Sequence, residues 1–385
     1  MGNFVKNAVK NILISYKKLT AKFKRKQTVL LCCQSTTMDE HLLKVYNSIK
    51  DENLKIKFVF FKQSKIDKTR YQNYGLNKKL IIKSKVKFFF SNPNLIVTAD
   101  LMYQSKYFIS KILYVNHGSS TICIEGHKNV AFSYNNVLLK GEKPYDLYFE
   151  TNKLACKYMQ SLEKFKDKVV FSGNKFSDEL NSEMENYEKY RTQLGIKPNQ
   201  KTIFIAASWK ESSLFHKLGK SIFEEIKNLS KNEDLKFILS IHPNEYHVYD
   251  ENIEPLGKYV DEMEQFGCII KKPGTDFIPY MIASDLVICD YSSVGDNAIM
   301  AEKDLVYSEF SRDDLYEFSS ANVLYDKLPK LKNSKDLEKI ITSKYPKEAK
   351  AEILNFKELM TSPKGSYKQL CIKHIKSLLT KKEKN

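Results

Sequence analysis

The sequence predicts an α/β protein built from two doubly wound domains that face a central cleft. Short apolar, β-branched or aromatic runs alternate with polar helical stretches along most of the chain, which is the pattern of parallel strands buried on both faces. The alternation comes in two blocks, separated by a highly polar segment. A length of 385 residues suits two domains better than one.

The first block, at residues 27–180, carries seven candidate strands. They are Val29–Cys32, Ile56–Phe61, Val86–Phe90, Leu95–Thr98, Ile112–Asn116, Leu147–Glu150 and Val169–Ser172. The polar segment that follows ends with Gly195 and Pro198, which are typical of a helix stop. We therefore expect a linker at residues 181–200 and a domain boundary there.

The second block, at residues 201–365, repeats the alternation. Its candidate strands are Ile203–Ala206, Phe237–Ile241, Cys268–Ile270, Leu286–Cys289 and Leu305–Tyr307. Its candidate helices are Leu214–Leu229, Val260–Phe266, Phe277–Ala283, Ser292–Glu302, Leu337–Ile341 and Ala349–Leu359. A basic helix and tail at residues 366–385, with a helix at Tyr367–Leu379, closes the chain.

The charge and the cysteines narrow the class of protein. The net charge is +17 and both chain ends are basic, which favours an anionic partner such as a phosphorylated substrate, an anionic lipid or a nucleic acid. The seven cysteines are scattered without a CxxC pair. Neither a zinc site nor a disulfide framework is indicated, and a reducing cytoplasm is expected. No apolar run approaches the roughly 20 residues of a membrane-spanning helix.

Residues 1–26 are expected to form a basic amphipathic helix that associates with a membrane. Apolar residues recur at helical spacing, and no acidic residue precedes Asp39. Such a helix lies in the headgroup region of an anionic bilayer. Packing of the apolar stripe on the domain is the alternative. RNA binding is disfavoured because no RNP-like aromatic pattern or zinc knuckle accompanies the charge.

Polar residues follow the candidate strands at four places. In an α/β domain, side chains just after the strands line the ligand cleft. The four places are Asn116-His117-Gly118-Ser119-Ser120, Ser208-Trp209-Lys210-Glu211, His242-Pro243 and Asp290-Tyr291-Ser292-Ser293. Their recurrence at strand ends in both blocks predicts one shared site.

The last of these places opens a helix with Ser292 and Ser293. Serine hydroxyls cap free backbone N–H groups, and such N–H groups can also hold an anion. Taken alone, the pair fits an ordinary helix cap as well as a phosphate site.

Together these segments resemble the CDP-glycerol glycerophosphotransferase family of teichoic acid and capsule synthesis. The resemblance is carried, in order, by Asn116-His117-Gly118, by Ala206-Ala207-Ser208-Trp209-Lys210, by His242-Pro243 and by the run from Ser284-Asp285 to Ser293. It covers roughly residues 110 to 310. It implies the GT-B architecture, with two Rossmann-like domains of which the first takes the acceptor and the second the CDP-activated donor.

The sequence departs from the family pattern at three positions. Gly173-Asn174-Lys175 stands where the family often has Gly-x-Pro-Arg, and Lys210 also replaces an arginine. Lysine does not make the bidentate phosphate contact of arginine. Asn297, preceded by Asp296, stands where an acidic residue is usual. Either of these two residues is a candidate for the ribose contact.

The resemblance implies transfer of a polyol phosphate, glycerol phosphate first, from a CDP-polyol donor to an acceptor hydroxyl, with release of CMP. The catalytic candidates are His117 and His242. The donor phosphate would be bound by Ser292, Ser293, Lys210 and Lys175, and the nucleotide would be bound by Ser208, Trp209, Asp290, Asp296 and Asn297. The acceptor side would include Gly118 and Ser119. No DxD motif or carboxylate cluster is present, so no metal and no cofactor beyond the donor substrate is expected.

The expected partners are CDP-glycerol or CDP-ribitol, a polyprenyl-linked or polymer acceptor, and an anionic membrane surface. Nucleic acid is not expected. These partners place the protein in the cytoplasm, peripheral on the inner face of a bacterial cell membrane. Two alternatives stay open: a GT-B glycosyltransferase that uses a nucleotide sugar, and a non-catalytic basic protein that binds membranes or nucleic acid through its ends.

Overall fold

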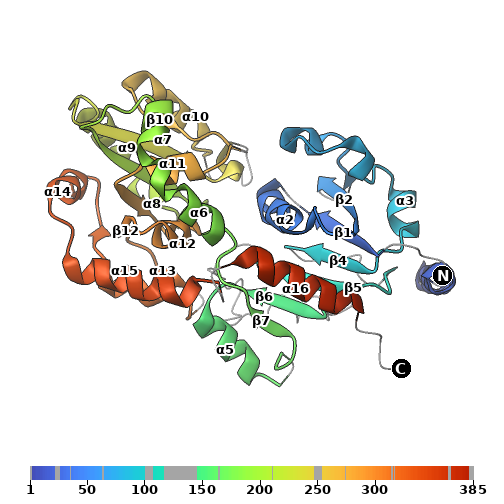
Figure 1. Ribbon diagram of the computed structural model, residues 1–385. Helices are drawn as coiled ribbons and strands as arrows, with labels where there is room; N and C mark the ends of the chain where they lie inside the picture. Colours follow the sequence, from blue (N-terminus) through green and yellow to red (C-terminus); the bar gives the residue numbers. More distant parts are fainter. Residues whose placement is uncertain are drawn as a thin grey trace. The chain divides into compact units, whose positions relative to one another are not determined.

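The computed structural model describes residues 2–21, 27–34, 36–62, 65–99, 107–116, 145–163, 165–209, 211–246, 254–273, 275–313, 315, 317–362 and 366–380. Two compact units make up this part of the chain (Figure 1). Unit 1 contains the described residues up to Asn116, those from Tyr145 to Lys175 and those from Ser362 onward. Unit 2 runs from Phe176 to Thr361.

Unit 1 is built on a sheet of seven strands in the order β3-β2-β1-β4-β5-β6-β7. The pairings are parallel, apart from the antiparallel pairing of β3 with β2. The strands are β1 (Thr28–Cys33), β2 (Lys55–Lys62), β3 (Lys65–Ile66), β4 (Leu95–Thr98), β5 (Lys111–Val115), β6 (Leu147–Glu150) and β7 (Val169–Phe171).

Helices cover both faces of this sheet. Strand residues such as Val29 and Leu31 pack with α2 (Thr36–Ile49) and α16 (Tyr367–Thr380) in one core. The alternate residues, such as Leu30, pack with α3 (Lys85–Phe90) and α5 (Lys153–Ser161) in the other. The 3-10 helices η1 (Arg70–Tyr74) and η2 (Lys78–Leu80) precede α3, and α1 (Gly2–Ala21) begins the chain.

Unit 2 has a parallel sheet of six strands in the order β10-β9-β8-β11-β12-β13. The strands are β8 (Lys201–Ala207), β9 (Leu235–Ile241), β10 (Ile269–Ile270), β11 (Leu286–Cys289), β12 (Asp304–Ser308) and β13 (Lys330–Leu331). Winding proceeds from β8 to one side and then from β11 to the other. The boundary between β8 and β11 is therefore the topological switch point, where ligands of such sheets bind at the carboxyl ends of the strands.

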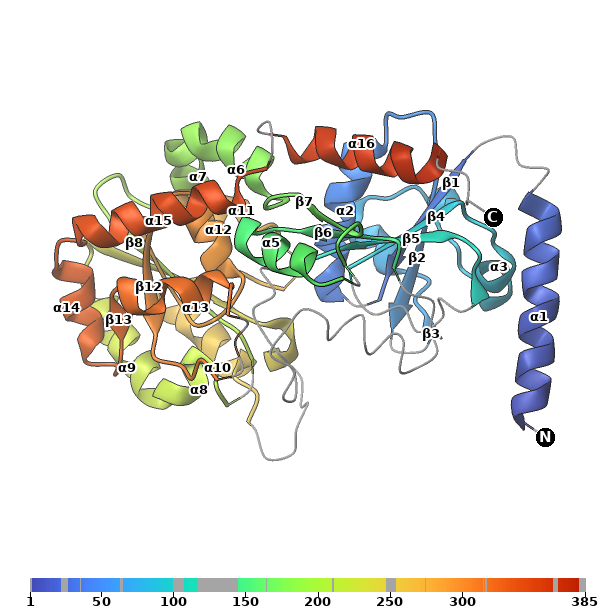
Figure 2. The ribbon, with the colours of Figure 1, turned by 90° about the horizontal axis from the view of Figure 1, so that it is seen from below.

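The helices of unit 2 connect these strands and cover the sheet (Figures 1 and 2). They are α6 (Ser177–Glu183), η4 (Met184–Asn186), α7 (Tyr187–Gln193), α8 (Leu214–Leu218), α9 (Lys220–Leu229), η5 (Pro243–Tyr246), α10 (Gly257–Glu262), η6 (Met263–Phe266), α11 (Ile278–Ala283), α12 (Val294–Met300), α13 (Ser320–Leu324), η7 (Tyr325–Lys327), α14 (Asp336–Thr342) and α15 (Lys347–Met360). Among the described helices, none is both long enough and apolar enough to cross a membrane.

Two predicted elements are wrong. Val86–Phe90 is not a strand but lies in the helix α3, where Ser84 caps the start by accepting from the backbone N–H of Lys87 at 3.5 Å. Its β-prone residues are overridden because Phe88 is buried in a core behind the sheet. The expected helix Leu214–Leu229 is interrupted at Gly219, whose φ of 60° and ψ of −154° suit only glycine.

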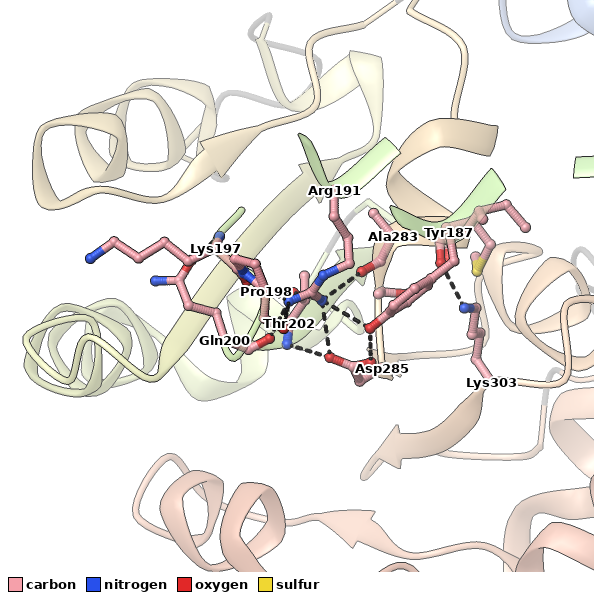
Figure 3. Close-up of polar contacts among 12 residues, drawn as sticks. Tyr187, Arg191, Lys197, Pro198, Gln200, Thr202, Ala283, Asp285 and Lys303 are labelled. Atoms are coloured by element: carbon pink, nitrogen blue, oxygen red, sulfur yellow. Dashed lines mark hydrogen bonds and ion pairs between the residues drawn. The ribbon is translucent and has the colours of Figure 1, made fainter. Parts of the chain in front are cut away.

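The segment expected as a linker, residues 181–200, is folded into unit 2. Its anchor is Arg191, a fully buried side chain at the amino end of the sheet. One guanidinium nitrogen donates to Thr202 Oγ1 at 2.9 Å and lies 3.5 Å from Asp285 Oδ2, and the other reaches three backbone oxygens, those of Lys197, Pro198 and Gln200 (Figure 3). A polar sequence therefore became a packed element because one arginine satisfies several buried carbonyl groups.

The end of the chain also differs from expectation. The final basic helix, α16, is not a separate tail but belongs to unit 1 (Figure 1). Tyr367, Leu370, Cys371 and Ile375 are buried in the core beside α2. The chain therefore leaves unit 1 after Lys175 and returns at Ser362.

Candidate active site

Three of the four polar places found in the sequence lie at neighbouring strand ends of unit 2 or directly beside them. Ser208 and Trp209 follow β8, His242 follows β9, and Asp290 follows β11. In the sheet register Ala207 pairs with Ile241, and Ala206 pairs with Cys289. The three places therefore meet at the carboxyl edge of the sheet, at and next to the switch point.

Asp290 ties the loops of this edge together. Its carboxylate accepts hydrogen bonds from the backbone N–H of Ser208, Leu214 and Ser292, at 2.9, 3.0 and 2.9 Å, and from Ser208 Oγ at 2.8 Å. Burial raises the pKa of Asp290, and these hydrogen bonds act in the opposite direction. With no exposed surface, Asp290 can position the turn and the β8 loop, and it has no free face for a nucleotide.

The turn after Asp290 presents two half-buried hydroxyl groups, those of Ser292 and Ser293. Ser292 Oγ accepts from the N–H of Val294 at 3.3 Å, whereas the Ser293 side chain makes no capping hydrogen bond. Tyr291 OH lies 2.6 Å from Ser212 Oγ and so adds a second tie to the β8 loop. The helix α12 that follows has only seven residues, so the hydroxyl groups matter more than the helix dipole.

The two candidates for the ribose contact are both buried. Asp296 accepts a hydrogen bond from Ser320 Oγ, at the start of α13. Asn297 is also buried. Both lie within α12, between the turn and the core. Their position favours a role in holding the turn against α13.

His242 is a neutral hydrogen-bond donor at this edge. Its Nδ1 faces the backbone N–H of Asn244 at 3.2 Å, which leaves Nε2 to carry the proton. Burial lowers the pKa of His242 to about 4, although the carboxylate of Glu245 acts in the opposite direction. The ring of Trp209 stacks on the imidazole ring with 5.5 Å between centroids.

Glu245 and its partner His216 belong to this site and were missed by the sequence analysis. Glu245 is completely buried, and its carboxylate lies 3.0 Å from His216 Nε2. This contact joins η5, just behind His242, to α8. In the sequence, Glu245 could have been recognised as an acid three residues after His242, within a short polar run.

A second polar group lies at the carboxyl edge of the unit 1 sheet. Asn116 and Glu150 follow or end the paired strands β5 and β6, and Asn116 Nδ2 lies 3.3 Å from Glu150 Oε2. Lys175 is buried, and its Nζ donates to the backbone oxygen of Asn116. Lys175 thus holds the end of β5. Glu150 was not among the predicted site residues.

Burial raises the pKa of Glu150 to about 7, and the hydrogen bonds from the Thr151 backbone and from Asn116 act against that rise. In the sequence, Glu150 could have been recognised as an acid at the end of a buried strand.

Four predicted site residues lie outside the described residues: His117, Gly118, Ser119 and Lys210. Within the described ranges, no three His, Cys, Asp or Glu side chains are grouped to hold a metal ion.

Comparisons with known proteins agree with this architecture. The teichoic acid poly(glycerol phosphate) polymerase of Bacillus spizizenii is 30% identical over 197 residues, which are 48% of this chain and 47% of that protein. The chain thus spans about half the length of this curated relative.

Among solved structures, the wall teichoic acid polymerase TagF matches with a TM-score of 0.62 and 16% identity, over 98% of this chain and 97% of the other. The UDP-GlcNAc 2-epimerase of Methanocaldococcus jannaschii matches with a TM-score of 0.57 and 14% identity, over 91% and 100% of the two chains. At these identities the likeness concerns the fold, and the fold is GT-B.

The sequence itself gives the more specific match. The family model described as CDP-Glycerol:Poly(glycerophosphate) glycerophosphotransferase matches residues 14–303. This range includes the strands β1 to β11, the Asp290 turn and His242. The chain therefore belongs to the CDP-glycerol:poly(glycerophosphate) glycerophosphotransferase family.

Proposed function

We propose that this protein transfers glycerol phosphate from CDP-glycerol to a hydroxyl group of a teichoic-acid-type acceptor. The observation that carries the proposal is the meeting of His242, Ser208 and the Ser292–Ser293 turn at the switch point of unit 2, in a chain of this family. A structure of a TagF variant was obtained after a soak with CDPG, which supports the choice of donor.

In the proposed reaction, the acceptor oxygen attacks the β-phosphorus of the donor. The new O–P bond forms as the bond from that phosphorus to the bridging oxygen breaks, and CMP leaves with the bridging oxygen. The acceptor proton goes to a base, for which His117 is our candidate because neutral imidazole accepts a proton near pH 7. Gly118 and Ser119 are proposed on the acceptor side.

His242 is proposed to stabilise the negative charge that develops on the transferring phosphate or on CMP. A neutral imidazole whose Nδ1 is occupied by a backbone N–H offers Nε2–H to one oxygen. A hydrogen-bond donor that is fixed in place before the reaction stabilises the transition state most where negative charge develops. The contact of the buried Glu245, in η5, with the half-buried His216 supports the loop that carries His242.

Donor phosphate oxygens are proposed to bind the hydroxyl groups of Ser292 and Ser293, with charge from Lys210. Ser208 and Trp209 are proposed to contact the nucleotide. Because Asp290, Asp296 and Asn297 are buried, we propose that they act on the nucleotide by positioning the turn. Lys175 acts in the same way on Asn116, next to His117.

The acceptor is proposed to be a polyprenyl-linked or polymeric chain at the inner face of a bacterial membrane. The basic α1 suits attachment to that surface. CDP-ribitol stays a second donor to be tested. The reaction is proposed to need no metal ion, and activity that is lost with EDTA and restored by a divalent cation would contradict this.

The test is CMP release by the full chain from CDP-glycerol, CDP-ribitol and UDP-sugars, with and without a lipid-linked acceptor. We expect acceptor-dependent release of CMP from a CDP-polyol. We expect no acceptor-dependent turnover of UDP-sugars. His242→Ala should lower turnover at least about a hundredfold, and Ser292→Ala should lower it about tenfold.

Two variants serve as matched controls. His374→Gln changes a half-buried histidine of α16 that packs on Phe149, and Ser221→Ala removes an exposed hydroxyl that donates to the backbone oxygen of Leu218, at the end of α8. Both should keep wild-type turnover. The assignment is wrong if His117→Ala and His242→Ala both keep it too, and turnover of UDP-sugars alone would favour the glycosyltransferase.

A further inference from the structure

Glu150 is a buried acid that has no part in the reaction proposed for this chain. It ends β6 at the carboxyl edge of the unit 1 sheet, and only 2% of the residue is exposed. Burial of an acid is unfavourable unless hydrogen bonds compensate for the lost water. The compensation is incomplete, because burial raises the pKa of Glu150 to about 7. A glutamine of the same shape would avoid this cost, so an acid at this place indicates a functional role.

The backbone and the side chain of Glu150 are both held. Its backbone oxygen accepts from the backbone N–H of Ser172 at 2.7 Å and from Ser172 Oγ at 3.1 Å, directly after β7. Its carboxylate Oε1 accepts from the backbone N–H of Thr151 at 2.8 Å. Asn152, the next residue, caps α5 by accepting from the backbone N–H of Leu154 at 2.8 Å. The acid therefore lies in a rigid corner between β6, β7 and α5.

The other carboxylate oxygen of Glu150 faces the neighbouring strand. β6 lies between β5 and β7 in the sheet (Figure 1), and Val115 of β5 pairs with Phe149 of β6. Asn116 and Glu150 are the next residues along the two chains, and Asn116 Nδ2 donates to Glu150 Oε2 at 3.3 Å. The sheet register therefore brings this donor and this acceptor together.

Asn116 is held at two points. Its side chain is bound by Glu150, and its backbone oxygen accepts from Nζ of the buried Lys175. A peptide group is planar, so a held carbonyl oxygen restrains the direction in which the chain continues beyond Asn116. The residue that follows is His117, the proposed base. A base must lie within hydrogen-bond reach of the proton that it takes, so a small change of direction at Asn116 affects the reaction.

We propose that Glu150 is a positioning residue for the transfer reaction. Through its hydrogen bond to Asn116, and together with Lys175, it fixes the direction in which the chain leaves β5 towards His117. The proposal rests on the proposed function, because the role of Glu150 is defined by the base that it positions. It includes no contact of Glu150 with the donor or the acceptor.

The first variant is Glu150→Gln in the full chain, assayed with CDP-glycerol and the lipid-linked acceptor. The amide oxygen keeps the hydrogen bond from the Thr151 N–H, and the amide nitrogen then meets Asn116 Nδ2, so that two donors face each other. We expect kcat for CMP release to fall about tenfold or more. The KM for CDP-glycerol should stay unchanged, because the donor is proposed to bind in unit 2.

The second variant adds Asn116→Asp to Glu150→Gln. The amide nitrogen at position 150 then donates to a carboxylate at position 116, which restores one donor and one acceptor at the same net charge, with the direction of the bond reversed. We expect kcat to return to within about threefold of the wild type. A loss of stability alone would lower the folded fraction and leave the kcat of the folded protein unchanged.

A matched pair of the same chemistry serves as the control. Asn186 Nδ2 donates to Glu183 Oε2 at 2.7 Å in unit 2, where Glu183 ends α6 and Asn186 ends η4. Glu183→Gln, alone and with Asn186→Asp, should leave kcat and KM as in the wild type. Circular dichroism and thermal denaturation confirm that each variant is folded, and kcat is expressed per folded protein.

Two results would overturn the proposal. If Glu150→Gln keeps the wild-type kcat while His117→Ala loses turnover, the base is needed but Glu150 does not position it. If kcat falls in Glu150→Gln and Asn116→Asp does not restore it, Glu150 does not act through Asn116. Wild-type turnover of His117→Ala is a separate result: it overturns the assignment of the base, and this role of Glu150 with it.

Discussion

The indole ring of Trp209 lies almost parallel to the imidazole ring of His242, with 5.5 Å between centroids and 19° between planes. The two residues follow adjacent parallel strands, β8 and β9, whose ends are in register at Ala207 and Ile241. The stack is therefore set by the sheet. It covers one face of the histidine proposed to act on the phosphate and leaves Nε2 with its proton.

Replacement of Trp209 is expected to change the titration of His242. Burial lowers the pKa of His242 to about 4, and the indole supplies part of that burial. Trp209→Ala should therefore raise the pKa towards its ordinary value of about 6.5. Trp209→Phe keeps an aromatic cover and should hold the pKa nearer that of the wild type. NMR titration of the imidazole Cε1–H measures both, and equal values in wild type and Trp209→Ala would refute this role.

The same histidine makes stability depend on pH. Between about pH 4 and pH 6.5 the unfolded chain binds a proton at this position that the folded chain does not bind. The free energy of unfolding should therefore rise with pH across this window, by up to roughly 3 kcal/mol. Chemical denaturation at several pH values measures the rise. His242→Gln should remove this part of the pH dependence, and an unchanged slope would contradict it.

Glu150 should act with the opposite sign. Burial raises the pKa of Glu150 to about 7, so the folded chain binds a proton that the unfolded chain has released. Its contribution is present below about pH 4.5 and is lost as pH rises through 7. Glu150→Gln should flatten the loss of stability between these values. The exposed Glu163→Gln is the control, and a similar change in both variants would exclude the assignment to Glu150.

Asp290→Asn is expected to weaken both the fold and the site. The carboxylate accepts only from N–H and O–H donors of the two loops, and an amide would direct its own N–H group at one of them. We expect a loss of about 3 kcal/mol in the free energy of unfolding, together with weaker donor binding.

Thermal denaturation and CMP release measure the two effects of Asp290→Asn. Asp313→Asn is the matched control, because Asp313 is exposed and accepts from Ser311 Oγ in a surface turn. It should change stability by less than about 0.5 kcal/mol. A stable Asp290→Asn variant with normal turnover would remove Asp290 from the site.

Gly173→Ala should destabilise unit 1 where the chain crosses between the units. Gly173 has a φ of +73°, and an added Cβ would lie 2.4 Å from the backbone nitrogen of Ser362. The loss should exceed about 3 kcal/mol, from conformation and contact together. Gly195 has a similar φ of +69° with open space around it. Gly195→Ala should therefore cost only about 1 kcal/mol. Denaturation midpoints compare the two, and equal losses would show that the contact with Ser362 has no effect.

Much of the fold could be predicted because buried parallel strands are continuous apolar runs. Leu147–Glu150 and Leu286–Cys289 were predicted to the residue. Val86–Phe90 failed because a short aromatic run fits a strand or a helix, and the choice lies with its packing and with the Ser84 cap. Residues 181–200 looked like a linker because the carbonyl groups that Arg191 binds cannot be recognised from local composition.

Part of the site could also be predicted, since side chains after parallel strands must gather at one edge of a sheet. Ser208, Trp209, His242 and Ser292 follow that rule. The role of each of these residues could not be predicted. Asp290 looked like a ligand-binding residue, and only its burial and its four donors reveal a positioning residue. Glu150 and Glu245 were missed because the burial of an acid depends on its neighbours in space.

The sequence by itself determined the two blocks of alternating elements, the family and the strand ends at which the polar residues gather, because these depend on local periodicity and chain order. The tertiary structure decided which of these residues are buried and which keep an open face. It turned Asp290 inward, stacked Trp209 on His242, and paired Glu150 with Asn116. Burial and pKa depend on contacts between segments distant in the sequence, and only the folded chain brings those segments together.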